Sequence, residues 1–217
     1  MTALLENRPE RGNAILILAH GAGAPMDSDY MNALADALQG NGIHVIRFEF
    51  PYMAERRNGG GKKPPNPQKR LLDCWREVFR QVSDDVRPAG LPLLIGGKSM
   101  GGRMASLVAD ELGADGLCCF GFPFHPPGKP EKMRTGHFAA LLTPTLILQG
   151  TRDPFGKPDA IRDTDWSGAV SLRWLEEGDH DFKTRKSSGR TQGELIDAAA
   201  RQVAEFATRL RQGSSPE

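Results

Sequence analysis

The sequence predicts an α/β fold, in which a mainly parallel sheet carries helices on both of its faces. Short, continuous apolar runs alternate along the chain with segments whose apolar residues recur at helical spacing. Apolar runs without polar alternation are typical of strands that are buried on both faces, as in parallel sheets covered by helices. Glycine- and proline-rich stretches separate the runs, as expected of the turns between such elements.

Six apolar runs are the expected strands, at residues 14–19, 43–48, 93–95, 116–122, 145–149 and 170–175. Helical spacing of apolar residues predicts helices near residues 28–40, 71–82, 104–112, 158–162 and 194–210. Asp27 or Ser28 is the expected N-cap of the first helix. Thr191 and Glu194 form a capping box at the start of the last helix.

The chain has 217 residues, enough for one domain with a sizeable core, and we find no internal repeat or dividing linker. We therefore expect a single domain over residues 1–217, with flexible tails at residues 1–13 and 212–217. Residues 51–67 are rich in glycine, proline and basic residues, which predicts a long flexible loop.

Composition excludes several classes of function. The 28 basic and 27 acidic residues nearly balance, so no global charge favours nucleic acid or an anionic membrane. No apolar run approaches the roughly 18 residues of a membrane span, and the N-terminal residues lack the layout of a signal peptide. The three cysteines show no disulfide or metal-ligand spacing. We expect a cytoplasmic protein without metal or cofactor.

Gly97, Ser99 and Gly101 form a G-x-S-x-G pattern between a predicted strand and a predicted helix. In this pattern the serine occupies a tight, strained turn, and side chains at the glycine positions would collide with the strand and the helix. A glycine-rich turn that only packs a helix on its strand is the alternative. A phosphate-binding loop is excluded, because Pro92 stands where its first glycine is required.

Polar residues follow the expected strands at their carboxyl ends, where functional residues of parallel sheets gather. Ser99, Asp153 and His180 occur in the chain order that accompanies such a serine turn. A serine hydroxyl needs a neighbouring base, and the base needs an orienting carboxylate, before it can attack a carbonyl at neutral pH. Only His180 of the five histidines follows Asp153. The sequence predicts these three as catalytic residues; for His180 the alternative is a solvated loop histidine. Three carboxylates that lie in or after a helix are alternatives to Asp153: Asp159, Asp163 and Asp165.

The oxyanion of a tetrahedral intermediate requires two N–H donors. We assign one to Met100, directly after the nucleophile, and the other to Ala22, in the small-residue loop after the first strand. His20 in that loop is expected to be a structural partner rather than a base. His125, in a proline-rich connection, either lines the substrate site or packs among the prolines.

Four motifs together resemble the α/β-hydrolase superfamily, specifically its small, lidless members near the dienelactone hydrolases: residues 20–23 (HGAG), 97–103 (GKSMGGR), 122–130 (FPFHPPGKP) and 150–156 (GTRDPFG). They also resemble one branch of predicted bacterial hydrolases, which includes a testis-expressed animal protein and a subunit of an acetyltransferase complex. The resemblance spans residues 14–210 and implies the α/β-hydrolase fold and the triad of Ser99, Asp153 and His180. It implies no substrate.

The superfamily usually opens its sheet with an antiparallel hairpin, and the stretch before the first buried strand is too short for one. We therefore expect a minimal sheet of about six strands. The connection over residues 123–143 is too short for a lid domain.

These observations predict a serine hydrolase that cleaves a small or exposed carboxylic ester or thioester through an acyl-enzyme intermediate; an amide substrate is not distinguished. The alternative is an interaction module of the same fold with little or no activity. A basic cluster either attracts an anionic substrate or partner or is only a solvated loop: Arg56, Arg57, Lys62 and Lys63.

Overall fold

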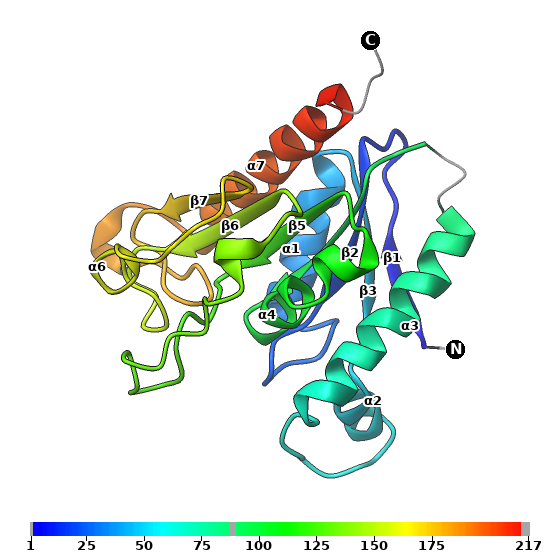
Figure 1. Ribbon diagram of the computed structural model, residues 1–217, viewed down its shortest axis with the longest axis horizontal. Helices are drawn as coiled ribbons and strands as arrows, with labels where there is room; N and C mark the ends of the chain where they lie inside the picture. Colours follow the sequence, from blue (N-terminus) through cyan, green and yellow to red (C-terminus); the bar gives the residue numbers. More distant parts are fainter. Residues whose placement is uncertain (1, 87–89, 214–217) are drawn as a thin grey trace.

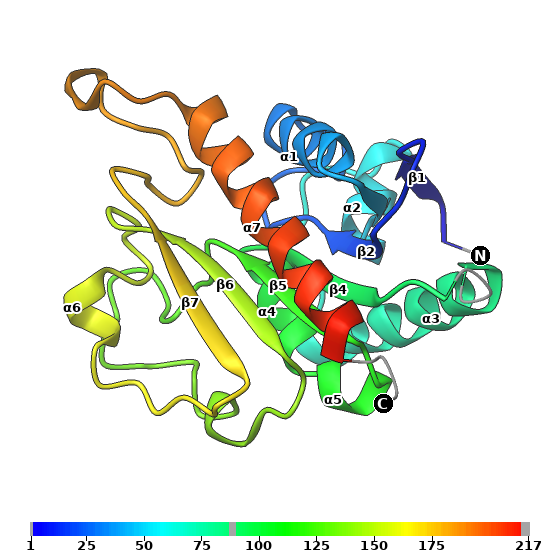
Figure 2. The same ribbon diagram turned by 90° about the horizontal axis from the view of Figure 1, so that it is seen from above.

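The computed structural model describes residues 2–86 and 90–213, and a seven-stranded sheet forms its centre (Figures 1 and 2). Along the sheet the strand order is β1-β3-β2-β4-β5-β6-β7. Every neighbouring pair is parallel except β1 and β3, so the predicted mainly parallel sheet is confirmed. The strands are β1 (Leu4–Asn7), β2 (Ala14–Ala19), β3 (Ile43–Phe48), β4 (Leu93–Lys98), β5 (Gly116–Phe120), β6 (Thr145–Gly150) and β7 (Val170–Leu175).

The expected count of about six strands is one short, because β1 adds an antiparallel edge strand. Leu4 of β1 lies opposite Phe48 of β3, and Asn7 lies opposite Val45. This strand falls within residues 1–13, which were expected to be a flexible tail. Its four residues are only partly buried or exposed, so they form no apolar run by which the sequence could reveal them. The C-terminal tail expected at residues 212–217 lies partly outside the described residues, and residues 212 and 213 belong to the last helix.

Helices cover both faces of the sheet (Figure 2). Helices α1 and α7 pack on one face and α3 and α4 on the other. The helices are α1 (Asp29–Gly40), α2 (Pro51–Arg57), α3 (Gln68–Val86), α4 (Met100–Ser106), α5 (Ala109–Leu112), α6 (Pro158–Ile161) and α7 (Gln192–Gly213), with 3₁₀ turns at Phe138–Ala140 and Lys186–Ser188. None of the helices described combines the length and the apolar character that a membrane crossing needs.

Strand β2 explains why the strands read as continuous apolar runs. Leu16 and Leu18 pack in the core beneath α1 and α7, whereas Ile15 and Ile17 pack in the core beneath α3 and α4. Successive side chains of a strand point to opposite faces, and here both faces are covered. A strand covered on both faces, such as β2, therefore needs apolar residues at successive positions.

Helix starts are partly as predicted. The capping box is confirmed, because Thr191 N donates to Glu194 Oε2 at 2.7 Å and Glu194 N donates to Thr191 Oγ1 at 3.2 Å. Ser28 is the N-cap of α1, although its side chain makes no capping hydrogen bond.

The prediction of a flexible loop over residues 51–67 is wrong in its first part. Pro51 starts α2, a position where proline is favoured, and the next two residues are buried.

The chain reverses its direction of progress across the sheet between β2 and β4. After β2 it adds β3 on one side, and β4 then returns to the other side of β2. Ligand crevices of open α/β sheets form at the carboxyl ends of the two strands that flank such a reversal. Because Ala19 pairs with Gly97, the loops that follow these two strands start side by side.

Candidate active site

Ser99 stands on a strained turn between β4 and α4. Its φ of 51° and ψ of −115° lie in a region that non-glycine residues rarely adopt. Its N–H donates to Phe120 O at 3.0 Å. A Cβ on Gly97 would lie 2.6 Å from the carbonyl carbon of Gly101, and one on Gly101 would lie 2.6 Å from the oxygen of His20. The steric need for both glycines, predicted from the motif, is confirmed.

The structure brings Ser99, His180 and Asp153 into one chain of hydrogen bonds. His180 Nε2 lies 2.9 Å from Ser99 Oγ, and His180 Nδ1 lies 2.8 Å from Asp153 Oδ2. An ionised carboxylate can only accept, so Nδ1 carries the proton and Nε2 is left free to accept from the serine hydroxyl. The alternative of a fully solvated His180 does not fit, because its side chain is only 21% exposed.

Hydrogen bonds fix the position of the Asp153 carboxylate, which is completely buried. Gln149 Nε2 donates to its Oδ2 at 2.9 Å, and Phe155 N donates to its Oδ1 at 2.8 Å. Gln149 Oε1 in turn accepts from Phe122 N at 2.8 Å. Two donors besides the histidine therefore hold a carboxylate that burial alone would disfavour.

Lys98 holds the loop that carries His180. Its Nζ donates to the carbonyl oxygen of His180 at 2.6 Å and lies 3.3 Å from Asp181 Oδ1. Burial lowers the pKa of the Lys98 ammonium, while the charges of Asp181 and Asp153 oppose that shift. On the other side, the Phe155 ring packs edge-on against the imidazole at a centroid distance of 4.6 Å.

His20 and Tyr52 form hydrogen bonds with the backbone of the loop after β2. His20 is buried; its Nδ1 lies 2.6 Å from Gly21 O, and Phe50 N donates to its Nε2 at 3.1 Å. Tyr52 Oη donates to Ala22 O at 2.9 Å. Burial lowers the pKa of His20. Its two ring nitrogens contact backbone groups, which fits the structural role expected for this residue.

Two cavities flank Ser99, and both are lined by Ala22, Ser99 and Phe155. The first, here named the lysine cavity, has a volume of about 520 Å³ and is also lined by Lys98 and His180. The second, here named the arginine cavity, has a volume of about 380 Å³ and includes Met100, Arg103 and Arg134.

The three remaining predicted site residues differ in their placement. Ala22 lines both cavities, and Met100 lines the arginine cavity next to Ser99. His125 is buried, and its Nδ1 lies 3.0 Å from Pro126 O. It lines neither cavity, so the structure does not bring it to Ser99.

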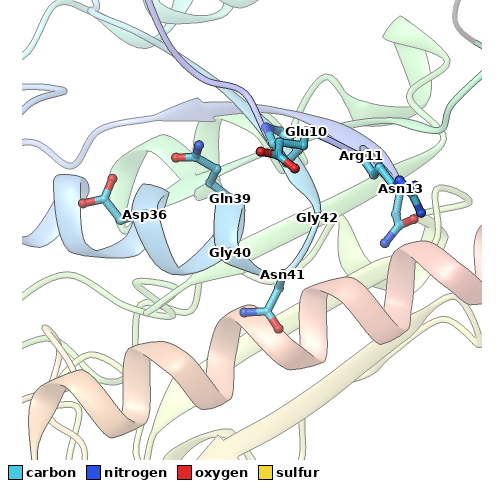
Figure 3. A pocket seen from close by; sticks show the side chains of 9 residues that line it. Glu10, Arg11, Asn13, Asp36, Gln39, Gly40, Asn41 and Gly42 are labelled. Carbon is cyan, nitrogen blue, oxygen red and sulfur yellow. The ribbon is translucent and has the colours of Figure 1, made fainter.

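A larger hollow of about 610 Å³ lies far from Ser99, at the amino ends of β2 and β3. Figure 3 shows Asp36 and Gln39 on α1 near the segment with Glu10 and Arg11, whereas the side chain of Asn41, directly after the helix, points the other way. Polar groups here already have partners: Gln39 Nε2 donates to the Arg8 carbonyl oxygen at 3.0 Å. This hollow contains none of the predicted site residues.

Several site residues were missed by the sequence reasoning. Lys98 and Gln149 each interrupt an apolar run at the carboxyl end of a strand, which is a usable signal. Arg103 follows Ser99 by four residues and so lies on the same face of α4, a weaker signal. Arg134 lies in an irregular connection, where no local pattern marks it.

The described residues contain no group of three or more His, Cys, Asp or Glu side chains that could hold a metal ion. The three cysteines are buried free thiols. Burial raises the pKa of Cys74 to about 12, which is typical of inert core thiols.

Comparison with solved structures shows the same fold in known hydrolases. The chain is similar to an a/b serine hydrolase without lid from Xanthomonas campestris, with 21% identity, a TM-score of 0.69 and coverage of 94% of this chain and 88% of that chain. It is similar to dienelactone hydrolase from Anabaena variabilis, with 19% identity, a TM-score of 0.70 and coverage of 94% and 90%. It is also similar to Est1E from Butyrivibrio proteoclasticus, with 14% identity, a TM-score of 0.66 and coverage of 95% of this chain and 94% of that chain.

No curated protein matches the sequence. A family model described as an alpha/beta hydrolase domain, however, matches residues 12–208, which is most of the chain. The sheet order, the strained serine turn and this match agree with one another. The chain belongs to the α/β-hydrolase family.

Proposed function

We propose that this protein is a serine hydrolase that cleaves a carboxylic ester or thioester. The observation that carries the proposal is the chain of hydrogen bonds from Ser99 Oγ through His180 to Asp153, at 2.9 and 2.8 Å, on a strained turn that opens onto two cavities. A strained backbone persists only where the surrounding structure stabilises it, and such strain clusters at functional sites.

In the proposed reaction, His180 Nε2 takes the hydroxyl proton of Ser99 while Oγ attacks the substrate carbonyl carbon. The N–H groups of Ala22 and Met100 bind the oxyanion that forms. His180 then gives its proton to the leaving alcohol or thiol, and the carbonyl–leaving-group bond breaks to leave an acyl-enzyme. Water repeats the sequence, with His180 as base, to release the acid and restore Ser99.

Asp153 orients the imidazole and stabilises its positive charge during each proton transfer. Lys98 serves as a positioning residue, since it holds the carbonyl oxygen of His180. The mechanism uses only these side chains and backbone groups, so it requires no cofactor. The open cavities favour a small acyl substrate, and the similar Est1E has been solved with ferulic acid bound. We also propose, from the four motifs, that the chain belongs to the branch of predicted hydrolases described above.

Labelling by a fluorophosphonate probe, read by intact mass, tests this proposal. We expect one label per molecule of wild type, none on Ser99→Ala, and a rate at least a hundredfold lower on His180→Ala, because the serine then lacks its base. Circular dichroism and thermal unfolding confirm that each variant is folded.

The chain offers a matched control, because a second serine–histidine pair exists elsewhere. Ser106 Oγ lies 2.8 Å from His137 Nε2, but Ser106 is buried at the end of α4. Labelling of Ser106→Ala should equal that of the wild type. A folded wild type that takes no label would contradict the proposal and favour an interaction module.

A further inference from the structure

The arginine cavity contains two guanidinium groups beside the candidate nucleophile. Arg103 lies one helical turn after Ser99, and its backbone N–H donates to Ser99 O at 3.0 Å. Because residues four apart share a helix face, its side chain projects on the side of α4 that carries Ser99. Arg134 lines the same cavity from the connection between β5 and β6, where its backbone N–H donates to Phe124 O at 2.7 Å.

Neither guanidinium forms an ion pair with a carboxylate among the described residues. Arg103 Nη2 donates to the neutral Gln68 at 3.3 Å, and its buried Nε has no hydrogen-bond partner. Burial lowers the pKa of Arg103, and the positive charge of Arg134 lowers it further. No acidic group in the described part of the chain offsets these two effects. Half-burying two like charges together is unfavourable unless an anion joins them.

Two ion-paired arginines of the chain provide a contrast. Arg57 contacts Glu49 and Asp27, both at 2.7 Å, and Arg76 contacts Glu111 at 2.7 Å. Each of these guanidiniums has its counterion within the protein. Within residues 2–86 and 90–213, the arginine cavity has no such counterion, as expected of a site whose counterion arrives with the ligand.

The position of His180 indicates which part of the substrate enters the arginine cavity. His180 lines the lysine cavity and not the arginine cavity. Because His180 must protonate the leaving group, the leaving group belongs on the lysine-cavity side. The acyl chain then extends past Met100 into the arginine cavity, toward the two guanidiniums.

We propose that the arginine cavity binds an oxyanion at the far end of the acyl chain, so that the preferred substrates are esters or thioesters of acids that carry a second, anionic group. A carboxylate or a phosphate has the required chemistry, since a guanidinium binds either through two parallel hydrogen bonds. This inference rests on the proposed function of Ser99.

Two matched substrates test it: the mono-4-nitrophenyl ester of adipic acid with its free carboxylate, and the same ester with that carboxylate capped as a methyl ester. We expect wild type to have a higher kcat/KM for the free acid. Arg103→Gln should lower the ratio of the two kcat/KM values by roughly 10-fold to 100-fold, as expected for a lost charge-assisted hydrogen bond. Arg57→Gln, an equal loss of charge outside the two cavities, should keep the wild-type ratio. A ratio of one in wild type, or an unchanged ratio in Arg103→Gln, overturns the inference.

Binding to the inactive Ser99→Ala variant separates this inference from the proposed function. Monomethyl adipate and inorganic phosphate are added separately, and thermal unfolding is measured, because a ligand that binds the folded state raises Tm. A rise in Tm that occurs in Ser99→Ala and is lost in Ser99→Ala/Arg103→Gln supports anion binding, even if Ser99 takes no fluorophosphonate label. The anion that gives the rise shows whether the cavity binds a carboxylate or a phosphate. No rise with either anion, in a protein whose Ser99 is labelled, overturns the inference and leaves the proposed function intact.

Discussion

The two cavities beside Ser99 both contain cationic side chains, but the charges are used differently. In the lysine cavity, Lys98 contacts the carbonyl oxygen of His180 and lies 3.3 Å from Asp181. In the arginine cavity, the positive charges of Arg103 and Arg134 repel each other, and neither has a carboxylate partner among the described residues. Lys98, whose counterion is part of the protein, positions His180, whereas the two arginines of the open cavity have cationic groups left for a ligand.

The comparison also explains why the total number of basic residues is a poor guide to an anion site. The basic cluster in and after α2 is the more conspicuous feature of the sequence. In the structure, Arg57 contacts Glu49 and Asp27, and Lys63 contacts Glu55 at 2.9 Å. Two of its four cations are therefore balanced within the protein, which favours the structural explanation for Arg57 and Lys63.

The largest expected effect comes from Asp153, because the proposed reaction of either ester depends on its contact with His180. Asp153→Asn should lower kcat about ten-thousand-fold for both adipate esters, because the amide no longer fixes the imidazole tautomer or stabilises its charge. Steady-state kinetics on the two substrates measures this. Asp159→Asn is the matched control, since Asp159 is an exposed carboxylate on α6 and one of the rival acids in the sequence. Equal losses in the two variants would remove Asp153 from the proposed triad.

Lys98→Met is expected to have the next largest effect. Without the ammonium, the carbonyl oxygen of His180 loses its donor and Asp181 loses its cation, so the imidazole shifts from its position beside Ser99. A displacement of this kind lowers kcat by roughly 10-fold to 100-fold. The fall should be the same for the free and the capped adipate ester, with little change in KM. If Lys98→Met instead changed the ratio between the esters, the two cavities would not have the separate roles proposed here.

Stability measurements should distinguish the paired from the unpaired arginine. Arg57→Gln leaves the carboxylate of Glu49, which is only 5% exposed, without its cation. We expect a loss of about 1–2 kcal/mol in the free energy of unfolding, most of it from Glu49, since the exposed contact to Asp27 contributes little. Arg103→Gln removes a repulsion and leaves no carboxylate unpaired, so its stability should equal or exceed that of wild type. Urea unfolding of both variants measures this, and a larger loss in Arg103→Gln would make Arg103 a structural residue.

The sequence predicted those parts of the molecule that depend on local pattern. Buried strands must be apolar on both faces, and the turn at Ser99 requires glycines, so both leave a signature in consecutive residues. Strand β1 left none, because its four residues pair only at an edge. Arg103 and Arg134 become neighbours through the packing of α4 against the connection after β5, which no spacing along the chain encodes. The separation of paired from unpaired charges could likewise be seen only in the folded chain.

The smallest expected effect concerns His20, beneath the loop that borders both cavities. Burial lowers its pKa in the folded state, so the unfolded chain binds a proton at a pH where the folded protein does not. The stabilising effect of a neutral His20 is therefore complete above the unfolded pKa of about 6.5 and is lost as the pH falls below that value, by at most about 1.4 kcal/mol per pH unit. Urea unfolding between pH 7.5 and 5.5 measures this slope.

His20→Gln keeps a donor and an acceptor for Gly21 O and Phe50 N but cannot be protonated, so its stability should fall less with acid. The burial of His137 also lowers its pKa and leaves a residual slope in that variant. Equal slopes in wild type and His20→Gln would mean that the folded protein and the unfolded chain protonate His20 equally well, which would contradict the lowered pKa.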